Sequence, residues 1–125
     1  MLIVKTQIKP SKIHGIGLFA AEFISKGTLI WKYQSYLDQT IDDSKFKLLP
    51  KRAQEFLLKY ASYNIGWGGH ILCGDDARFT NHSSDPNTIS NDKFSTIAIR
   101  DIQIGEEITE NYRTIDDLAH KETWI

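Results

Sequence analysis

The sequence predicts a mainly β domain with one or two short helices, in the α+β class. Short apolar runs separated by glycine-rich or polar turns recur along the chain, whereas only residues 50–63 show helical periodicity. The strands also lack the regular alternation with helices that marks a parallel βαβ fold. With 125 residues, 41% hydrophobic and 25% charged, the chain is expected to form one domain over residues 1–125.

The first third of the chain is predicted to contain three strands. Residues 2–8 alternate apolar and polar side chains with a period near two, and Pro10 ends the pattern. The segment 14–33, HGIGLFAAEFISKGTLIWKY, contains short apolar runs that predict two further strands in a hairpin-like arrangement. The Ser-Lys-Gly sequence at 25–27 is typical of the turn between them.

The middle of the chain is predicted to hold the one convincing helix. Pro50 suits its start, and apolar residues then recur at i, i+3, i+4, i+7 and i+8, namely Ala53, Phe56, Leu57, Tyr60 and Ala61. Glycine-rich residues 64–70 predict a loop, and residues 70–74 a short strand. Residues 78–87, RFTNHSSDPN, are so dense in Asn, Ser, Asp and Pro that they exclude a long regular element.

The last third is predicted to add two strands and a terminal helix. A strand near 95–99 is followed by a turn around Gly105 and a second short strand that ends at Tyr112. In the tail, Thr114 is expected to be the N-cap of a helix, with Asp117 as the acidic member of its capping box.

Charge and composition narrow the classes of partner. Fifteen basic and sixteen acidic residues give a net charge of −1, so no direct nucleic-acid or membrane partner is expected. No apolar run is long enough for a membrane span or a signal peptide, and the single cysteine, Cys73, is interpreted as a small buried hydrophobe. We therefore expect an intracellular protein, cytoplasmic by default. The scattered histidines lack ligand spacing and predict no metal site: His14, His70, His82 and His120.

Several motifs allow more than one interpretation from the residues alone. Within RFTNHSSDPN, Asn81 begins a glycosylation sequon, His82 and Ser83 could pair as base and nucleophile, and the whole segment could be a ligand-binding loop. The missing export signal disfavours the sequon, and sequence neighbours seldom meet as nucleophile and base. GIGLFA at 15–20 fits a dinucleotide loop formally, but its glycines equally permit a tight bend. The adjacent acids at 106–107 would point to opposite faces of a strand.

In combination, the motifs resemble the SET-domain family of protein-lysine methyltransferases. They are GIG at 15–17, Lys32-Tyr33 after KGTLIW, RFTNHSSDPN at 78–87 and GEEITENY at 105–112, in the family's order and at about its spacing over residues 1–115. The resemblance implies a β-clip of small sheets. In that fold the C-terminal segment threads a loop, so that the NHS and GEE…Y segments meet in a pseudoknot.

The resemblance also implies a cofactor and a set of site residues. S-adenosylmethionine would be held by backbone around the first glycines and by polar and main-chain contacts, the implied residues being His14, Gly15, Ile16, Gly17, Arg78, Asn81, His82 and Tyr112. Tyr112 matches the active-site tyrosine, whose hydroxyl sits beside the transferring methyl group. Tyr33 matches a second tyrosine that lines the lysine channel. Aromatic walls attract the cationic lysine, while desolvation and the nearby sulfonium lower the pKa of its amine.

Departures from the family pattern point to a minimal, stand-alone form. Many members have a cysteine after NHS and three more in the tail, which together bind zinc. Here the first position is Ser84 and the tail, 113–125, contains no cysteine. The resemblance therefore implies that the whole zinc site is absent, and Trp124 is the residue we expect to close the lysine channel instead.

The resemblance places substrate selection in an inserted region at about 36–72. Asp38, Asp42 and Asp43 in this region could form an acidic patch for a basic substrate, or a solvated loop. Thr114 stands where relatives use a tyrosine or phenylalanine to limit the number of methyl groups, and its smaller size would leave room for more.

The expected function is S-adenosylmethionine-dependent methyl transfer to a lysine amine of a protein substrate, such as a histone tail. A histone substrate would place the protein in a nucleus, its own or a host's, and small relatives make a homodimer compatible with the sequence. The rival is a non-catalytic module of the same fold that binds lysine-rich peptides. The presence of Asn81, His82 and Tyr112 together argues against that rival.

Overall fold

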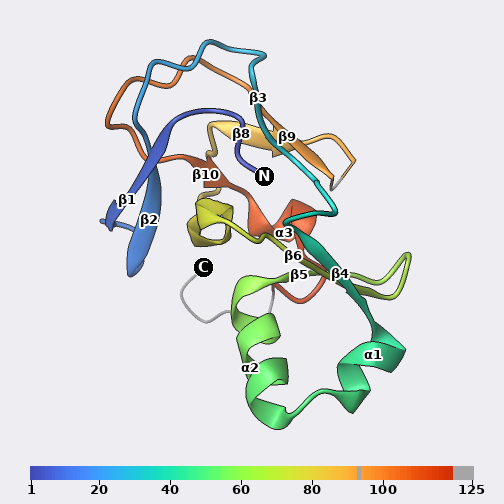
Figure 1. Ribbon diagram of the computed structural model, residues 1–125. Coiled ribbons are helices and arrows are strands. Elements are labelled where there is room, and N and C mark those ends of the chain that lie inside the picture. Colours follow the sequence, from blue (N-terminus) through green and yellow to red (C-terminus); the bar gives the residue numbers. More distant parts are fainter. Residues whose placement is uncertain (93, 120–125) are drawn as a thin grey trace.

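The computed structural model describes residues 1–92 and 94–119, and it is built from four small sheets and short helices (Figure 1). Two sheets have two strands each: β1 (Thr6–Pro10) with β2 (Ile16–Ala20), antiparallel, and β7 (Asn81–His82) with β10 (Thr109–Glu110), parallel. Two have three strands: β3 (Leu29–Lys32), β9 (Ser95–Ala98) and β8 (Thr88–Ser90), and β4 (Gln39–Asp42), β6 (Gly69–Leu72) and β5 (Ser62–Asn64). This arrangement confirms the predicted mainly β class.

The helices are short, and two of them lie at one end of the molecule. They are α1 (Asp43–Leu48), α2 (Lys51–Tyr60), the 3-10 helix η1 (Asp76–Phe79) and α3 (Tyr112–Ile115). In Figure 1, α1 and α2 lie together at the end opposite β3, β8 and β9. None of the helices in the described part of the chain is long and apolar enough to cross a membrane. The predicted helix after Pro50 is confirmed.

The predicted hairpin at 14–33 is wrong in its pairing. β2 pairs with β1, whereas β3 pairs with β9 from the far end of the chain. The turn before β3 does not fold back on β2, because Ile24 pairs with Ile102 and the N–H of Gly27 donates to Ala98 O at 2.8 Å. The opening strand also starts later than predicted, since Leu2 bridges Trp31 of β3 before the chain turns to meet β2.

Helix α1 has no apolar periodicity and was not predicted. The Asp42 carboxylate caps it by accepting from the Lys45 N–H at 2.8 Å, and it also accepts from the Ser44 hydroxyl. These hydrogen bonds lower the pKa of Asp42. The helix buries none of its residues, so a polar cap rather than an apolar stripe marks its position in the sequence.

The start of the predicted terminal helix is corrected by the structure. Helix α3 begins at Tyr112, and its N-cap is Asn111, whose side chain accepts from the Arg113 N–H at 3.1 Å. Thr114 lies inside the helix, and Asp117 accepts from the Ile65 N–H at 2.7 Å instead of closing a capping box. The acids after α3 therefore bind the chain to the backbone of β5 and the loop beyond it.

The apolar core is divided into two clusters. The larger lies beneath β2, β3 and β9 and contains Leu18, Ala20, Ile24, Ile30, Ala98, Ile102 and Ile108. The smaller contains Ile41, Leu57 and Ala61 and fixes α2 against β4 and β6. Leu57 and Ala61 belong to the predicted helical stripe, so the periodicity correctly identified the face of α2 that packs on the sheet.

His70 provides a test of the smaller cluster. It is 3% exposed and lies against the rings of Phe46 and Tyr63, and neither ring nitrogen has a hydrogen-bond partner among the described residues. Burial lowers the pKa of His70 in the folded chain. Below about pH 6.5 the His70 ring therefore binds a proton in the unfolded chain more readily than in the folded chain. The free energy of unfolding should therefore fall as the pH drops from 7 to 5.

The His70→Phe variant is expected to be more stable than the wild type by about 1 kcal/mol near pH 7, because it removes unpaired buried polar atoms. It should also lose part of the fall in stability below pH 6.5. Thermal unfolding at pH 5.5 and 8 measures both effects, with His14→Gln as the control for an exposed histidine. An unchanged pH dependence in His70→Phe would contradict the assignment of this effect to His70.

Candidate active site

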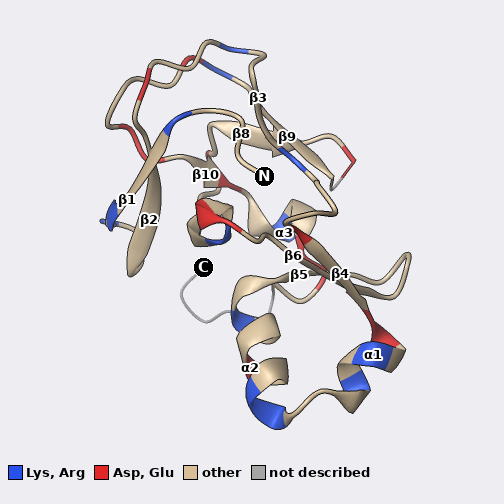
Figure 2. Cartoon of the chain, in the orientation of Figure 1, with Lys and Arg blue, Asp and Glu red and all other residues tan. Residues whose placement is uncertain are grey.

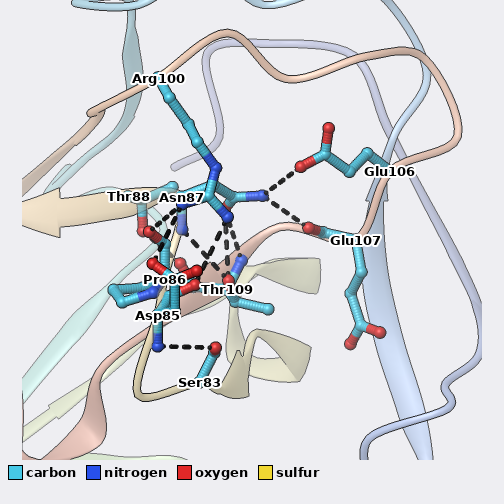
Figure 3. Close-up of polar contacts among 9 residues, drawn as sticks. All are labelled: Ser83, Asp85, Pro86, Asn87, Thr88, Arg100, Glu106, Glu107 and Thr109. Carbon is cyan, nitrogen blue, oxygen red and sulfur yellow. Dashed lines mark hydrogen bonds and ion pairs between the residues drawn. The ribbon is translucent and has the colours of Figure 1, made fainter.

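The two specific motifs meet at the parallel pair formed by β7 and β10. Asn81 pairs with Thr109, and His82 with Glu110, although the paired residues stand 28 positions apart. Figure 3 shows Asn87 between the two segments. Its Nδ2 donates to Glu106 Oε2 at 3.1 Å and to Glu107 O at 2.8 Å, and its Oδ1 accepts from the Thr109 N–H at 2.9 Å. The side chain of one residue thus binds both motifs in the expected pseudoknot.

Asn81 ties a third segment, the loop between β1 and β2, to this pair. Its Nδ2 lies 2.9 Å from His14 O, 3.2 Å from Ile16 O and 2.9 Å from Glu107 Oε2. Glu107 in turn accepts from the Ser11 hydroxyl at 2.8 Å. The amide of Asn81 therefore holds the loop in place through the carbonyls of His14 and Ile16.

Gly17 is required by this packing. A Cβ added there would lie 2.3 Å from Glu107 Oε2 and 3.0 Å from the Ser11 Cβ. Gly15 has a different reason to be glycine, since its φ of +47° is unfavourable for most side chains while the space around it is open. Of the two glycines in the GIG motif, only Gly17 must be glycine because a neighbouring group lies too close for a side chain. That group is the carboxylate of Glu107.

The Gly17→Ala variant is expected to lose about 1–3 kcal/mol of stability, because the added methyl group must displace the Glu107 carboxylate. The displacement should also weaken the contact of Asn81 with the loop. Thermal unfolding measures the loss, and Gly15→Asn is the matched control, since asparagine tolerates a positive φ and meets no neighbour there. Equal melting temperatures for the two variants would contradict the role given to Gly17.

An open cleft of about 760 Å³ lies beside this loop. Six of the residues expected to bind the cofactor line it: His14, Gly15, Ile16, Arg78, Asn81 and Tyr112. Gly17 and His82 are buried, and neither lines the cleft. The structure thus brings together residues from three separate motifs in one concave site.

One wall of the cleft comes from α2 and was not predicted. Glu55, Leu58, Lys59 and Tyr60 line it. Leu58 is 47% exposed and lies off the helical stripe that packs on the sheet. An apolar residue outside the stripe was the only signal in the sequence that α2 has a second, functional face.

Tyr112 is held at the inner end of the cleft by two hydrogen bonds. Its hydroxyl donates to Thr80 O at 2.5 Å, and its N–H donates to His82 Nδ1 at 3.1 Å. Burial and the nearby Arg113 guanidinium lower the pKa of His82, which favours the neutral ring whose Nδ1 can accept. His82 therefore acts from behind the cleft by positioning Tyr112.

At Tyr112 the cleft adjoins a further space, here called the inner channel. It consists of two adjacent hollows of about 100 and 70 Å³. Both are lined by Ser62, Ile71, Cys73, Ala77, Thr80, Glu110 and Ile115. Cys73, expected to be a small buried hydrophobe, is half-buried in this wall, and burial raises the pKa of its thiol.

A model of the SET domain matches residues 15–113 of the chain. The chain belongs to the SET-domain family. Among its relatives, the histone-lysine N-methyltransferase set1 of Dictyostelium discoideum is 35% identical over 119 residues, covering 87% of this chain and 8% of that protein. A putative histone-lysine N-methyltransferase 1 of Plasmodium falciparum is 32% identical over 124 residues, covering 88% of this chain and 2% of that protein. This SET domain thus spans less than a tenth of either relative.

Solved structures share the fold. The autoinhibited Chaetomium thermophilum Polycomb Repressive Complex 2 bound to S-adenosylmethionine superposes with a TM-score of 0.72 at 24% identity. That match covers 94% of this chain and 16% of the other. The architecture of small sheets joined at a pseudoknot is therefore that of a SET domain.

Three residues expected around the lysine channel lie elsewhere in this SET domain or outside the described residues. Tyr33 lines a separate surface hollow, packs edge-on against Phe94 and donates to Asp38 O at 3.3 Å. Thr114 donates to Asn111 O at 2.8 Å and does not line the inner channel, whereas the next residue, Ile115, does. Trp124 lies outside the described residues.

Metal binding has no candidate site in the described portion of this SET domain. Across residues 1–92 and 94–119, no three His, Cys, Asp or Glu side chains gather closely enough to hold an ion.

Proposed function

We propose that this SET domain transfers a methyl group from S-adenosylmethionine to the side-chain amine of a lysine in a protein substrate. The observation that carries the proposal is a cleft that adjoins the inner channel at Tyr112. A cofactor in the cleft and a lysine in the inner channel would meet at this residue. Relatives named as histone-lysine N-methyltransferases support the same reaction.

The lining of the cleft suits the cofactor. Its volume of about 760 Å³ is in the range of small-molecule sites. Arg78 can pair with a carboxylate, the backbone of residues 14–16 lines the cleft, and Leu58 and Phe79 provide apolar surface for a purine. When bound, S-adenosylmethionine supplies a methyl group already activated by a positively charged sulfur. The bound structure of the Polycomb complex is a precedent in the same fold.

The chain's own residues then have to position a neutral amine and exclude water. The hydroxyl of Tyr112, held by Thr80 O, presents its oxygen lone pairs at the junction of cleft and inner channel. Ile71, Ala77 and Ile115 provide apolar walls that would strip water from a lysine side chain. Alignment and desolvation of the reacting groups are the main contributions that an enzyme can make to such a transfer.

A histone is one candidate substrate, on the strength of the relatives' names. Of the acids that could form a patch for such a substrate, Asp38 is 2% exposed and bound to the N-terminal amine at 2.8 Å, whereas Asp42 caps α1 and is exposed. Figure 2 shows both acidic and basic residues on α1 and α2. A histone substrate would place the protein at chromatin, and these relatives give no support to the cytoplasmic default.

The proposal is tested with S-adenosylmethionine labelled on its methyl group, incubated with the protein and core histones or a cell lysate. Binding of S-adenosylhomocysteine is measured separately by calorimetry. Transfer of label to lysine, located by mass spectrometry, is the expected result and gives the number of methyl groups at once. Tight binding of lysine-rich peptides, unaffected by cofactor and without transfer, would favour the non-catalytic module instead.

A further inference from the structure

Glu110 is a carboxylic acid in the wall of the inner channel. In β10, Thr109 faces Asn87 in the pseudoknot, so the next side chain points to the opposite side. That side is the inner channel, and Glu110 lines both of its hollows. The acid thus stands within the space that continues from Tyr112, two residues further along the chain.

The protein offsets only part of the free-energy cost of burying this carboxyl group. The Thr96 hydroxyl donates to its Oε1 at 3.0 Å, and no lysine or arginine of the described chain forms an ion pair with it. The lining around it includes the apolar side chains of Ile71, Ile108 and Ile115. Burial accordingly raises the pKa of Glu110, and the hydrogen bond from Thr96 opposes this shift only in part. A cation entering the channel would relieve this cost.

The lining of the inner channel indicates which cation it would take. Apolar side chains that line both hollows, among them Ile71 and Ile115, stand beside the carboxyl group of Glu110, and this combination matches a primary ammonium on an aliphatic stem. We propose that Glu110 binds the ammonium group of the incoming lysine and accepts its proton before methyl transfer. This inference rests on the proposed function and adds a base that touches the reacting nitrogen.

The proposed step conserves charge and atoms. An N–H bond of the lysine ammonium breaks and an O–H bond forms on Glu110, which leaves a neutral amine and a neutral acid. The nitrogen lone pair then forms the bond to the methyl carbon, while the electrons of the carbon–sulfur bond remain on sulfur. The products are a methylated ammonium and an uncharged thioether. Glu110 releases its proton to water before the next lysine enters, so each transfer liberates one proton.

The Glu110→Gln variant separates this role from simple packing, because glutamine keeps the shape and can still accept from Thr96. At pH 7 the variant should lose on the order of 100-fold in kcat/KM on a lysine peptide that the wild type methylates. The loss should shrink as the pH approaches about 10, where lysine in solution is already becoming neutral and needs no base. A purely structural defect would not be repaired by raising the pH.

Other titratable groups also face the inner channel and could contribute to a pH profile. They are Lys59, Tyr60, Cys73, Arg78, Tyr112 and Asp116. All of them are present in both the wild type and Glu110→Gln, so only the ratio of the two profiles reports on Glu110. Glu22→Gln, on the surface segment after β2, is the charge-matched control, and Glu110→Asp should restore part of the lost activity.

A second measurement does not require the protein substrate. With S-adenosylhomocysteine bound, n-butylammonium and 1-butanol are each titrated into the protein and followed by tryptophan fluorescence or NMR. The wild type should prefer the ammonium by at least about 10-fold, as expected for a charged pair out of water, and Glu110→Gln should lose the preference. Unchanged binding of both compounds, or an unchanged ratio of kcat/KM at every pH, would overturn the proposal.

The two proposals fail in different ways. If the wild type methylates no lysine although it binds S-adenosylhomocysteine, the proposed function is wrong, and the butylammonium titration alone decides whether Glu110 binds an ammonium. If the wild type methylates lysine and Glu110→Gln matches it at pH 7 with the same melting temperature, the proposed function stands and the role of Glu110 is wrong.

Discussion

The Tyr112→Phe variant is expected to lower kcat for methyl transfer by on the order of 100-fold or more. Phenylalanine keeps the ring against His82 and the N–H that donates to His82 Nδ1, so the start of α3 should not move. What is lost is the hydroxyl oxygen that Thr80 O fixes at the junction of the cleft and the inner channel. Single-turnover rates with labelled S-adenosylmethionine measure the effect directly.

A matched control is available at Tyr63, whose hydroxyl also makes one hydrogen bond, to Asp43 Oδ2 at 3.1 Å, but lines neither the cleft nor the inner channel. Tyr63→Phe should retain nearly full activity. Both variants should bind S-adenosylhomocysteine and melt within a few degrees of the wild type. Full activity in Tyr112→Phe, or an equal loss in both variants, would show that the hydroxyl of Tyr112 has no special part in the reaction.

The site was more predictable from the sequence than the pairing of the strands. Motif residues such as Asn81 and Tyr112 have to present particular atoms at the site. Their residue types and spacing therefore identify them even when the pairing of the strands is not known. The partner of a strand depends on contacts distant in sequence. Nothing in the apolar runs that form β2 and β3 indicates that the first pairs with β1 and the second with β9.

The residues that the sequence did not predict are those whose place in the site depends on how the chain folds. The face of α2 that lines the cleft could not be distinguished from a solvent-exposed face, because exposure of Leu58 depends on where the helix docks. The orientation of Glu110 toward the inner channel could not be predicted either. A glutamate in a short strand ordinarily faces water, and only the pairing of β10 with β7 turns this one toward the inner channel.

The same pairing depends on Asn87, and replacing this residue should cost more stability than the Gly17→Ala change. Asn87 is 1% exposed, and Asn87→Ala would leave the Thr109 N–H and the Glu107 carbonyl without their partner inside the protein. Each unsatisfied buried group costs about 1–3 kcal/mol, so a loss of roughly 3–5 kcal/mol is expected. Urea unfolding followed by fluorescence measures it, with Asn91→Ala at an exposed site as the control.

The consequence for function follows from what Asn87 connects. It holds β10 against β7, and β7 supplies the Asn81 that anchors the loop lining the cleft, while β10 supplies Glu110 and leads to Tyr112. Cofactor binding by Asn87→Ala should therefore weaken under conditions where the chain is still folded, before global unfolding. If S-adenosylhomocysteine bound this variant as tightly as the wild type, the pseudoknot would support the fold without organising the cleft.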